Sequence, residues 1–330
     1  MARDSANSNG NIERRSSKPQ QHTVINIEAD GKDKDESGTP PAKVAKDKSS
    51  QVANSNGKPV RYVYQGRDHM VEIYSNNLKC LSPATYLDDS IVRFYIAYLL
   101  KDICTESTAK TIHVFDNYFH KRLCETFPQK NENRVDQNKW RQLNKWFNGV
   151  DIFEKSFLIF PICQEEHWFV VIVCHPGEVI DTDHEELIMT PEHNEDTRRP
   201  KPLPGIIVMD SLGMSKRTIT KEIREFLDFE WRTRLTTIKD FSHHNLVQYH
   251  PKLPTQTNAF DCGIYTLAYL KAFATMPEKF YRLVRDHTPT NGDGRQDLPQ
   301  NMLDLVKKTL DTCGRDAIKA LIQKSCKIAM

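Results

Sequence analysis

Apolar residues recur at every third or fourth position in several stretches of the chain, which is the spacing of one helix face. The clearest stretch is 87–103, where Asp88 or Asp89 can cap the first turn. The same pattern predicts further helices at 114–127, 136–147, 217–231, 262–275, 278–286 and 299–323, the last of them broken near Gly314. Helices of this kind need an apolar surface to pack against, and the strand pattern supplies one.

Other apolar stretches are short, rich in β-branched and aromatic residues and bounded by turns, which is typical of strands. Segments 156–162 and 168–174 are joined by 163–167, a turn too short for a parallel crossover, so they predict an antiparallel hairpin. Further strands are predicted at 205–210 and 245–250, and the alternating segments RYVYQ and HMVEIYS predict two edge strands around a Gln-Gly-Arg-Asp turn. The pattern indicates an α+β fold with a small central sheet, mixed or antiparallel, flanked by helices.

Two polar stretches interrupt this pattern. Residues 1–58 are rich in Ser, Asn, Lys, Asp, Gly and Pro, and cannot bury enough apolar surface to offset the entropy of ordering, so we predict a disordered tail before a domain at 59–330. Segment 178–204 is a long polar insert within that domain, and such inserts are normally functional or disordered. The part at 286–330 is predicted to be mainly helical.

Composition excludes several classes of function. The net charge of +2 gives no reason to expect a nucleic-acid-binding surface, and no run of about 18 apolar residues predicts a membrane span. The N-terminus lacks the apolar segment of a secretory signal. The eight cysteines form no C-x-x-C pair, which predicts reduced, mostly buried thiols and no structural zinc site. His184 and His193 lie among acids without ligand spacing, so we expect a solvated loop there and no metal or organic cofactor.

Cys262 differs from the other cysteines because it begins an apolar helix. The helix dipole favours a thiolate at that place, and Gly263 next to it would let another backbone approach closely. A cysteine at a helix start is more often an ordinary core residue. Its chemistry therefore depends on which polar side chains the fold brings to it.

Three polar residues could act with this thiol. His167 begins one predicted strand and Asp210 ends another, so the two would share one sheet edge if the strands are neighbours. A carboxylate there would orient the imidazole and stabilise its charged form. Gln256 lies in the loop six residues before Cys262 and could donate to an oxyanion together with the backbone N–H of Cys262. Each residue alone is more often structural, whereas the combination indicates a nucleophilic site.

The segments HWFVVIV, IIVMDSL and QTNAFDCGIY, in this order, resemble the catalytic motifs of the SUMO-specific (sentrin-specific, Ulp-type) cysteine proteases. The segment YLDDSIVRFYIAYL resembles the upstream block of the same family, so the resemblance covers about 80–285. It implies a papain-like cysteine protease core, with Cys262 as nucleophile, His167 as general base, Asp210 as its orienting acid and Gln256 as oxyanion donor. The insert 178–204 resembles the insertions carried by members of the branch of this family that prefers poly-SUMO chains.

The resemblance also implies a substrate-binding set. Trp168 would lie over the C-terminal Gly-Gly of SUMO, and Tyr86 would form the second tunnel wall, where the family often has Trp. Asp88 stands where the family often has Asn, and Thr255 stands where it often has Gln. The implied activity is removal of SUMO from conjugates, chain editing or precursor maturation, by a monomer in the nucleus or cytoplasm.

Two other interpretations remain open at this stage. The same chemistry could act on NEDD8 or another ubiquitin-like protein, because specificity lies on a wide surface away from the catalytic residues. A pseudoenzyme that binds such a protein without cutting it is the other.

The tail also contains TVINIEAD, in which Val24, Ile25 and Ile27 precede acids. This is a candidate SUMO-interacting segment that would add a strand to a partner sheet.

Overall fold

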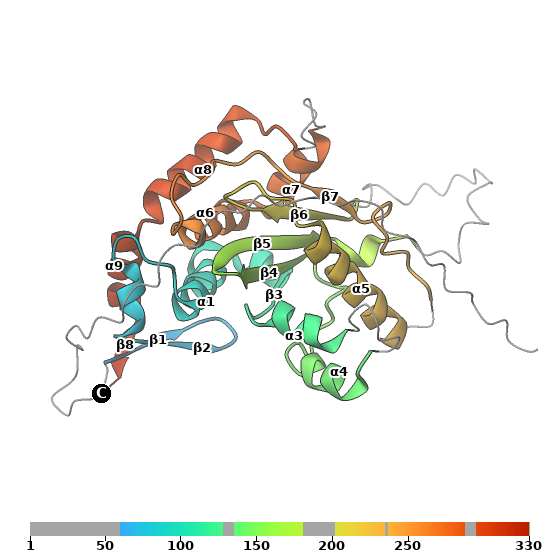
Figure 1. Cartoon of the computed structure of the whole chain (residues 1–330), viewed down its shortest axis with the longest axis horizontal. Helices are drawn as coiled ribbons and strands as arrows, with labels where there is room; N and C mark the ends of the chain where they lie inside the picture. The colour runs from blue at the N-terminus through green and yellow to red at the C-terminus, as the bar shows by residue number, and fades with distance from the viewer. Residues whose placement is uncertain (1–59, 128–134, 181–201, 235–236, 288–294, 330) are drawn as a thin grey trace, which may run out of the picture. The chain divides into compact units, whose positions relative to one another are not determined.

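The computed structural model describes residues 60–127, 135–180, 202–234, 237–287 and 295–329 (Figure 1). The predicted tail 1–58, with its candidate SUMO-interacting segment, lies outside the described residues. So do positions 181–201 of the polar insert, including His184 and His193.

A five-stranded sheet of order β3-β4-β5-β6-β7 forms the centre of the described domain. β4, β5 and β6 pair antiparallel, whereas β3 pairs parallel to β4 and β7 parallel to β6, so the sheet is mixed, as predicted. The strands are β3 (Ile112–Val114), β4 (Phe157–Gln164), β5 (His167–Cys174), β6 (Gly205–Met209) and β7 (Val247–Tyr249). The predicted hairpin 156–174 is the antiparallel pair β4–β5, which lies at the centre of this sheet.

The turn between β4 and β5 is shorter than predicted. Pairing continues to Gln164 and His167, so only Glu165 and Glu166 form the turn, not the whole of 163–167. Both have positive φ, 53° and 63°, the backbone that a two-residue type I′ hairpin requires. Neither residue is the Gly or Asn that this turn usually selects, so no residue signal marks so tight a turn.

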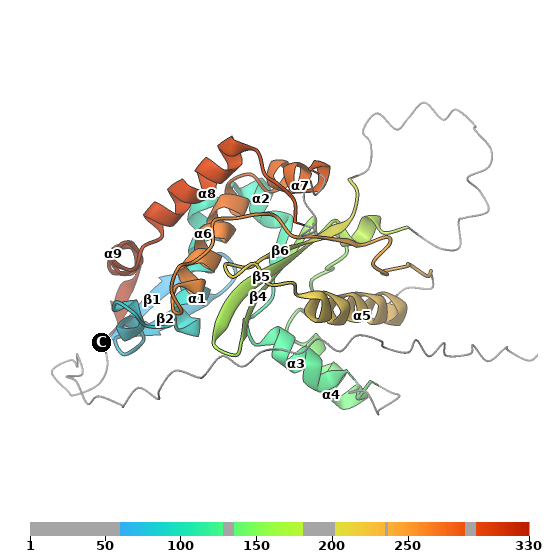
Figure 2. The same ribbon diagram turned by 45° about the horizontal axis from the view of Figure 1, so that its top comes forward.

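Helices cover both faces of this sheet, and the alternation of side chains along the strands decides which helices each face meets (Figures 1 and 2). Val170 and Ile172 of β5 face a core with α1, α6 and α8, whereas Phe169, Val171 and Val173 face a core with α3, α4 and α5. The helices are α1 (Asp89–Tyr98), α2 (Glu106–Lys110), α3 (Phe119–Thr126), α4 (Gln137–Asn144), α5 (Arg217–Arg234), α6 (Cys262–Thr275), α7 (Pro277–Asp286), α8 (Gln300–Thr312) and α9 (Arg315–Ser325).

Most of the predicted helices and strands are present, and the predictions differ from the structure mainly where elements are short. The predicted helix 114–127 is α3 alone, because its first residues belong to β3 and a turn. The predicted helix 87–103 continues beyond α1 as a π-helical turn, Leu99–Ile103. The break predicted near Gly314 separates α8 from α9. Elements of three to five residues such as β3 and α2 are too short to show a period.

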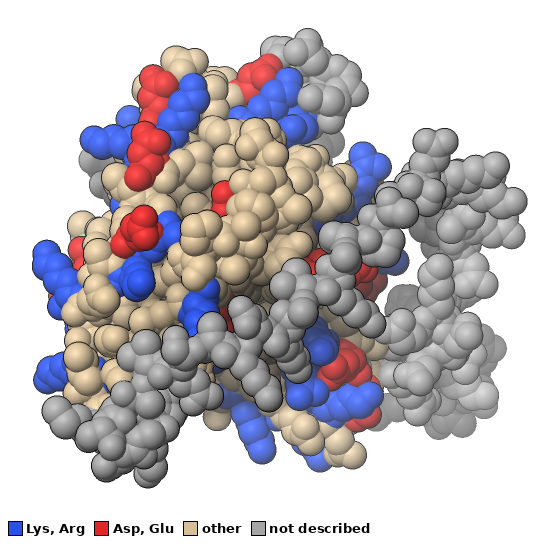
Figure 3. All heavy atoms as spheres, turned by 60° about the vertical axis from the view of Figure 1, so that its left-hand side comes forward, with Lys and Arg blue, Asp and Glu red and all other residues tan. Residues whose placement is uncertain are grey.

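A second, smaller sheet has the order β2-β1-β8. Its hairpin, β1 (Arg61–Gln65) and β2 (Met70–Tyr74), is the predicted one, but only β2 is an edge strand. β1 lies in the middle, because it also pairs with β8 (Lys327–Ala329), which was not predicted. No helix among the described residues is long and apolar enough to cross a membrane. Lys and Arg side chains are interspersed with Asp and Glu side chains on the face shown in Figure 3, in keeping with a net charge of only +2.

Candidate active site

The sheet brings His167 and Asp210 to the same edge. His167 is the first residue of β5 and Asp210 directly follows β6, and antiparallel pairing of these strands sets the start of one beside the end of the other. His167 Nε2 lies 3.1 Å from Asp210 Oδ2. The neighbourhood expected from the two strand ends is therefore what the structure shows.

Asp210 is held by more than the histidine. The residue is 2% exposed, and its Oδ1 accepts a 2.7 Å hydrogen bond from the backbone N–H of Leu212. Lys216 Nζ lies 3.0 Å from Oδ2, the oxygen that also meets His167. Burial alone would raise the pKa of Asp210, but the hydrogen bond with His167 and the charge of Lys216 outweigh it and lower the pKa to about 2. Asp210 is thus ionised throughout the neutral range.

Lys216 is a residue that sequence reasoning missed. Its ammonium group also lies 4.2 Å from the centroid of the Phe169 ring, and its side chain is 11% exposed. The chain between Asp210 and Lys216 forms a turn whose path no periodicity predicts. The only signal was a lysine shortly after the motif aspartate, which is too common to be informative.

The neighbours of His167 favour its charged form. Burial alone would lower its pKa, but hydrogen bonding with Asp210 and with Cys262, and the charges of both, raise it to about 9. Because Nε2 faces Asp210, Nδ1 is the ring nitrogen left for the sulfur. The imidazole is therefore set to hold a proton beside the thiol.

Cys262 is the first residue of α6 and is 1% exposed. Its Sγ lies 3.8 Å from the carbonyl oxygen of Glu166, in the turn that leads into His167. The backbone N–H of a first helical residue has no acceptor within its own helix, so it can donate to a bound oxyanion. A Cβ on Gly263 would lie 2.8 Å from the Cβ of Leu87, so the close approach predicted for this glycine is made by a side chain and not by another backbone.

Burial raises the pKa of the other seven thiols. They are Cys80, Cys104, Cys124, Cys163, Cys174, Cys313 and Cys326. All eight cysteines are free thiols. Only Cys174, Cys262 and Cys313 are fully buried, four are half-buried and Cys163 is exposed, so the prediction of mostly buried thiols was wrong. A raised thiol pKa disfavours the nucleophilic thiolate, so these seven are poor nucleophiles at neutral pH.

Gln256 is fixed by a second residue that the sequence analysis missed, Ser211. The Ser211 hydroxyl donates a 2.5 Å hydrogen bond to Gln256 Oε1, and the Ser211 carbonyl accepts a 3.1 Å bond from the Gln256 backbone N–H. Gln256 Nε2 donates to the Asn258 carbonyl, which leaves its second N–H for another acceptor. Ser211 directly follows Asp210, so one turn positions both the acid and the amide.

The loop before Cys262 is closed by local hydrogen bonds. Asn258 Oδ1 accepts from the backbone N–H groups of Phe260 and Asp261, and Asn258 Nδ2 donates to the Asp261 carboxylate. Asp261 also pairs with Arg315 at 2.7 Å. Asp261, although adjacent to the thiol in sequence, is therefore engaged with the loop and with α9, while Asp210 is the carboxylate that meets His167.

Residues 85–288 match the model of the Ulp1 protease family, C-terminal catalytic domain. This chain belongs to the Ulp1 protease family. The resemblance inferred from the motifs is thereby confirmed, and with it the α+β, papain-like fold class. The matched residues include Cys262, His167, Asp210 and Gln256.

Curated relatives carry similar names. Sentrin-specific protease 7 of Rattus norvegicus is 26% identical over 246 residues, which are 62% of this chain and 24% of that protein. Probable ubiquitin-like-specific protease 2A of Arabidopsis thaliana is 31% identical over 220 residues, 66% of this chain and 27% of that protein. The matched region thus spans about a quarter of either relative. A solved structure, the crystal structure of the de-sumoylating protease, shares the fold with a TM-score of 0.56 and 20% identity, over 80% of this chain and 89% of that one.

The three residues that the Ulp1 family resemblance assigns to substrate binding differ in exposure. Tyr86 is 41% exposed, whereas Trp168 is 1% exposed and donates a 3.1 Å hydrogen bond from Nε1 to the Leu87 carbonyl. Asp88 caps α1, accepting from the backbone N–H of Ser90 at 2.8 Å. Tyr86 is therefore accessible, whereas Trp168 and Asp88 hydrogen-bond to backbone next to it, and the substrate-binding role of all three stays a prediction.

Proposed function

We propose that this chain is a cysteine protease that cleaves after the C-terminal Gly-Gly of SUMO, releasing it from the lysine of a conjugate or from a precursor peptide. The observation that carries the proposal is the hydrogen-bonded pair His167–Asp210 beside Cys262 at the start of α6, within the matched Ulp1 domain. The choice of SUMO is supported by the names of the relatives.

The chemistry assigns one task to each residue. His167 takes the proton of the Cys262 thiol, and the sulfur bonds to the carbonyl carbon of the terminal glycine. The backbone N–H of Cys262 and the free N–H of Gln256 Nε2 stabilise the tetrahedral oxyanion. The C–N bond then breaks as the imidazolium protonates the leaving lysine amine. Water attacks the thioester, gives its proton to His167, and releases the glycine carboxylate and the thiol.

Cleavage of matched isopeptide substrates tests this proposal. SUMO and NEDD8, each joined through its terminal glycine to a lysine ε-amine of one peptide, are incubated with the full chain. We expect cleavage of the SUMO substrate, none by Cys262→Ser, and a rate lowered roughly 10²–10³-fold by Gln256→Ala. Faster cleavage of the NEDD8 substrate would reassign the modifier. Binding of SUMO without cleavage of either substrate would overturn the enzyme and favour a binding protein.

We further propose that the segment containing Val24, Ile25 and Ile27 holds a SUMO chain during repeated cleavage, and that the protein acts in the nucleus as a monomer. A tethered second site raises the local substrate concentration without changing the catalytic site. Deletion of 1–58 should therefore slow cleavage of poly-SUMO more than of mono-SUMO. An equal loss of rate on poly-SUMO and mono-SUMO would contradict the proposed tether. Light scattering and imaging of a fluorescent fusion measure the oligomeric state and the location.

A further inference from the structure

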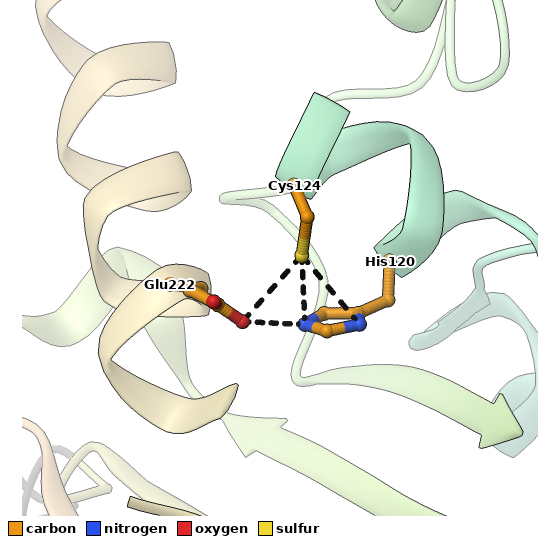
Figure 4. A group of neighbouring side chains, drawn as sticks. All are labelled: His120, Cys124 and Glu222. Atoms are coloured by element: carbon orange, nitrogen blue, oxygen red, sulfur yellow. Dashed lines mark hydrogen bonds and ion pairs between the residues drawn. The ribbon is translucent and has the colours of Figure 1, made fainter. Parts of the chain in front are cut away.

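A second cluster of reactive side chains lies between α3 and α5, separate from the catalytic residues. His120 and Cys124 are one turn apart on α3, so they share a helix face, and Glu222 of α5 lies opposite (Figure 4). Cys124 Sγ is 3.6 Å from His120 Nε2 and 3.6 Å from Glu222 Oε2, and His120 Nε2 is 2.8 Å from Glu222 Oε2. The proposed reaction uses none of these groups.

From this geometry we infer that His120, Cys124 and Glu222 form a binding site for Zn²⁺ or a chemically similar divalent ion. Imidazole, thiolate and carboxylate are the three ligand types that zinc uses, whereas Mg²⁺ and Ca²⁺ require oxygen ligands. One thiolate and one carboxylate would balance the charge of the ion, so the half-buried cluster would become neutral when occupied.

Two of the three ligand distances fit a tetrahedral ion. Zinc bond lengths place a thiolate sulfur about 3.6 Å from a nitrogen or oxygen ligand, and nitrogen about 3.3 Å from oxygen. Both sulfur distances already have this value, whereas the His120–Glu222 contact of 2.8 Å must open. The sulfur lies at similar distances from both ring nitrogens, 3.6 and 3.9 Å, so it does not lie along the lone-pair direction of either one. Binding requires the imidazole to turn until Nε2 points between the other two ligands.

A cavity beside the cluster leaves room for a fourth ligand. It has a volume of about 320 Å³ and is also lined by Gln164, Ser215 and Lys216. A water molecule there would complete the coordination, as in zinc sites with three protein ligands. Such an ion would join α3 to α5, the helix that follows the turn carrying Asp210 and Lys216. The cysteine spacing did not predict this site because its ligands come from two helices.

Cobalt spectroscopy tests the site. The full chain carrying Cys262→Ser is titrated with Co²⁺, since the proposed catalytic thiol and His167 could also bind a metal ion. We expect thiolate-to-cobalt charge-transfer absorption that saturates at one equivalent and is abolished by Zn²⁺. Adding Cys124→Ser should remove it, whereas the matched control Cys163→Ser should retain it. Absence of the absorption, or its persistence without Cys124, would overturn the site.

Two further measurements separate loss of binding from loss of fold. In the same Cys262→Ser background, Zn²⁺ should raise the Tm of the parent and of the Cys163→Ser control but not that of Cys124→Ser. Glu222→Gln keeps the size of the side chain and removes its charge, and should weaken zinc binding by more than the roughly 10–100-fold typical of losing an outer-shell partner. Unchanged affinity in Glu222→Gln would remove the carboxylate from the ligand set and refute the three-residue site.

Discussion

Replacing Asp210 by asparagine should lower the pKa of His167 and reduce its charged fraction at neutral pH. The attraction between an imidazolium and a carboxylate 3.1 Å apart is about 5 kcal/mol at an effective dielectric constant near 20. Burial opposes it and Cys262 adds to it, and the net result is a rise of the His167 pKa from 6.5 to about 9, which corresponds to about 3 kcal/mol. The Asp210→Asn variant would keep a hydrogen-bonding group but no charge, while burial would remain. Cys262 still favours the charged imidazole in the variant, so the pKa of His167 should fall clearly below 9 but keep that support.

NMR titration of the full chain with ¹³C-labelled histidine measures this directly. The resonance of His167 is assigned by its absence from His167→Gln, and its titration midpoint should move from about 9 to a clearly lower pH in Asp210→Asn. Cleavage at pH 8 should fall by about 10²–10⁴-fold, the usual worth of general acid–base catalysis. Asp261→Asn is the matched control, because Asp261 pairs with Arg315. In this variant the titration midpoint of His167 should stay near 9. A midpoint unchanged by Asp210→Asn would refute the electrostatic account.

Three further perturbations follow from the structure. Burial raises the pKa of Glu230 to about 7, so the free energy of unfolding falls as pH rises from 4.5 to 7. In urea unfolding, the difference in this free energy between Glu230→Gln and wild type should grow by about 2–3 kcal/mol in favour of the variant from pH 5 to pH 8. A difference independent of pH would contradict this. Ser211→Ala should lower kcat at least about tenfold with little change in KM, because Gln256 loses its support; an unchanged kcat would show that Ser211 does not position it. Replacing Glu165 by asparagine and Glu166 by glycine should raise stability by about 1 kcal/mol, and a lowered denaturation midpoint would argue against the strained turn.

The sequence indicated those parts of the fold that depend on local patterns. The apolar runs of β4 and β5 and the short link between them determine an antiparallel pair, and β6 follows as a third buried strand. Because adjacent antiparallel strands set the start of one beside the end of the other, His167 and Asp210 could be paired from their positions alone. Cys262 was assigned to a helix start that α6 reproduces.

The remaining features depend on contacts that have no local pattern. Lys216 and Ser211 act through the path of a turn, which the identity of its residues does not determine. The buried state of Trp168 depends on Leu87, which is distant in sequence. His120 and Glu222 meet only because two helices pack on the same sheet face. Such long-range packing becomes predictable only once the helix-to-sheet arrangement is known.

Capture by an electrophilic SUMO tests the central claim most directly. SUMO carrying a vinyl sulfone or propargyl group in place of its terminal carboxylate is mixed with the full chain, beside the same probe made from NEDD8. We predict a covalent adduct with SUMO, located at Cys262 by peptide mass spectrometry and absent from Cys262→Ser. An adduct at another cysteine, an adduct with NEDD8 alone, or no adduct with either probe would contradict the account.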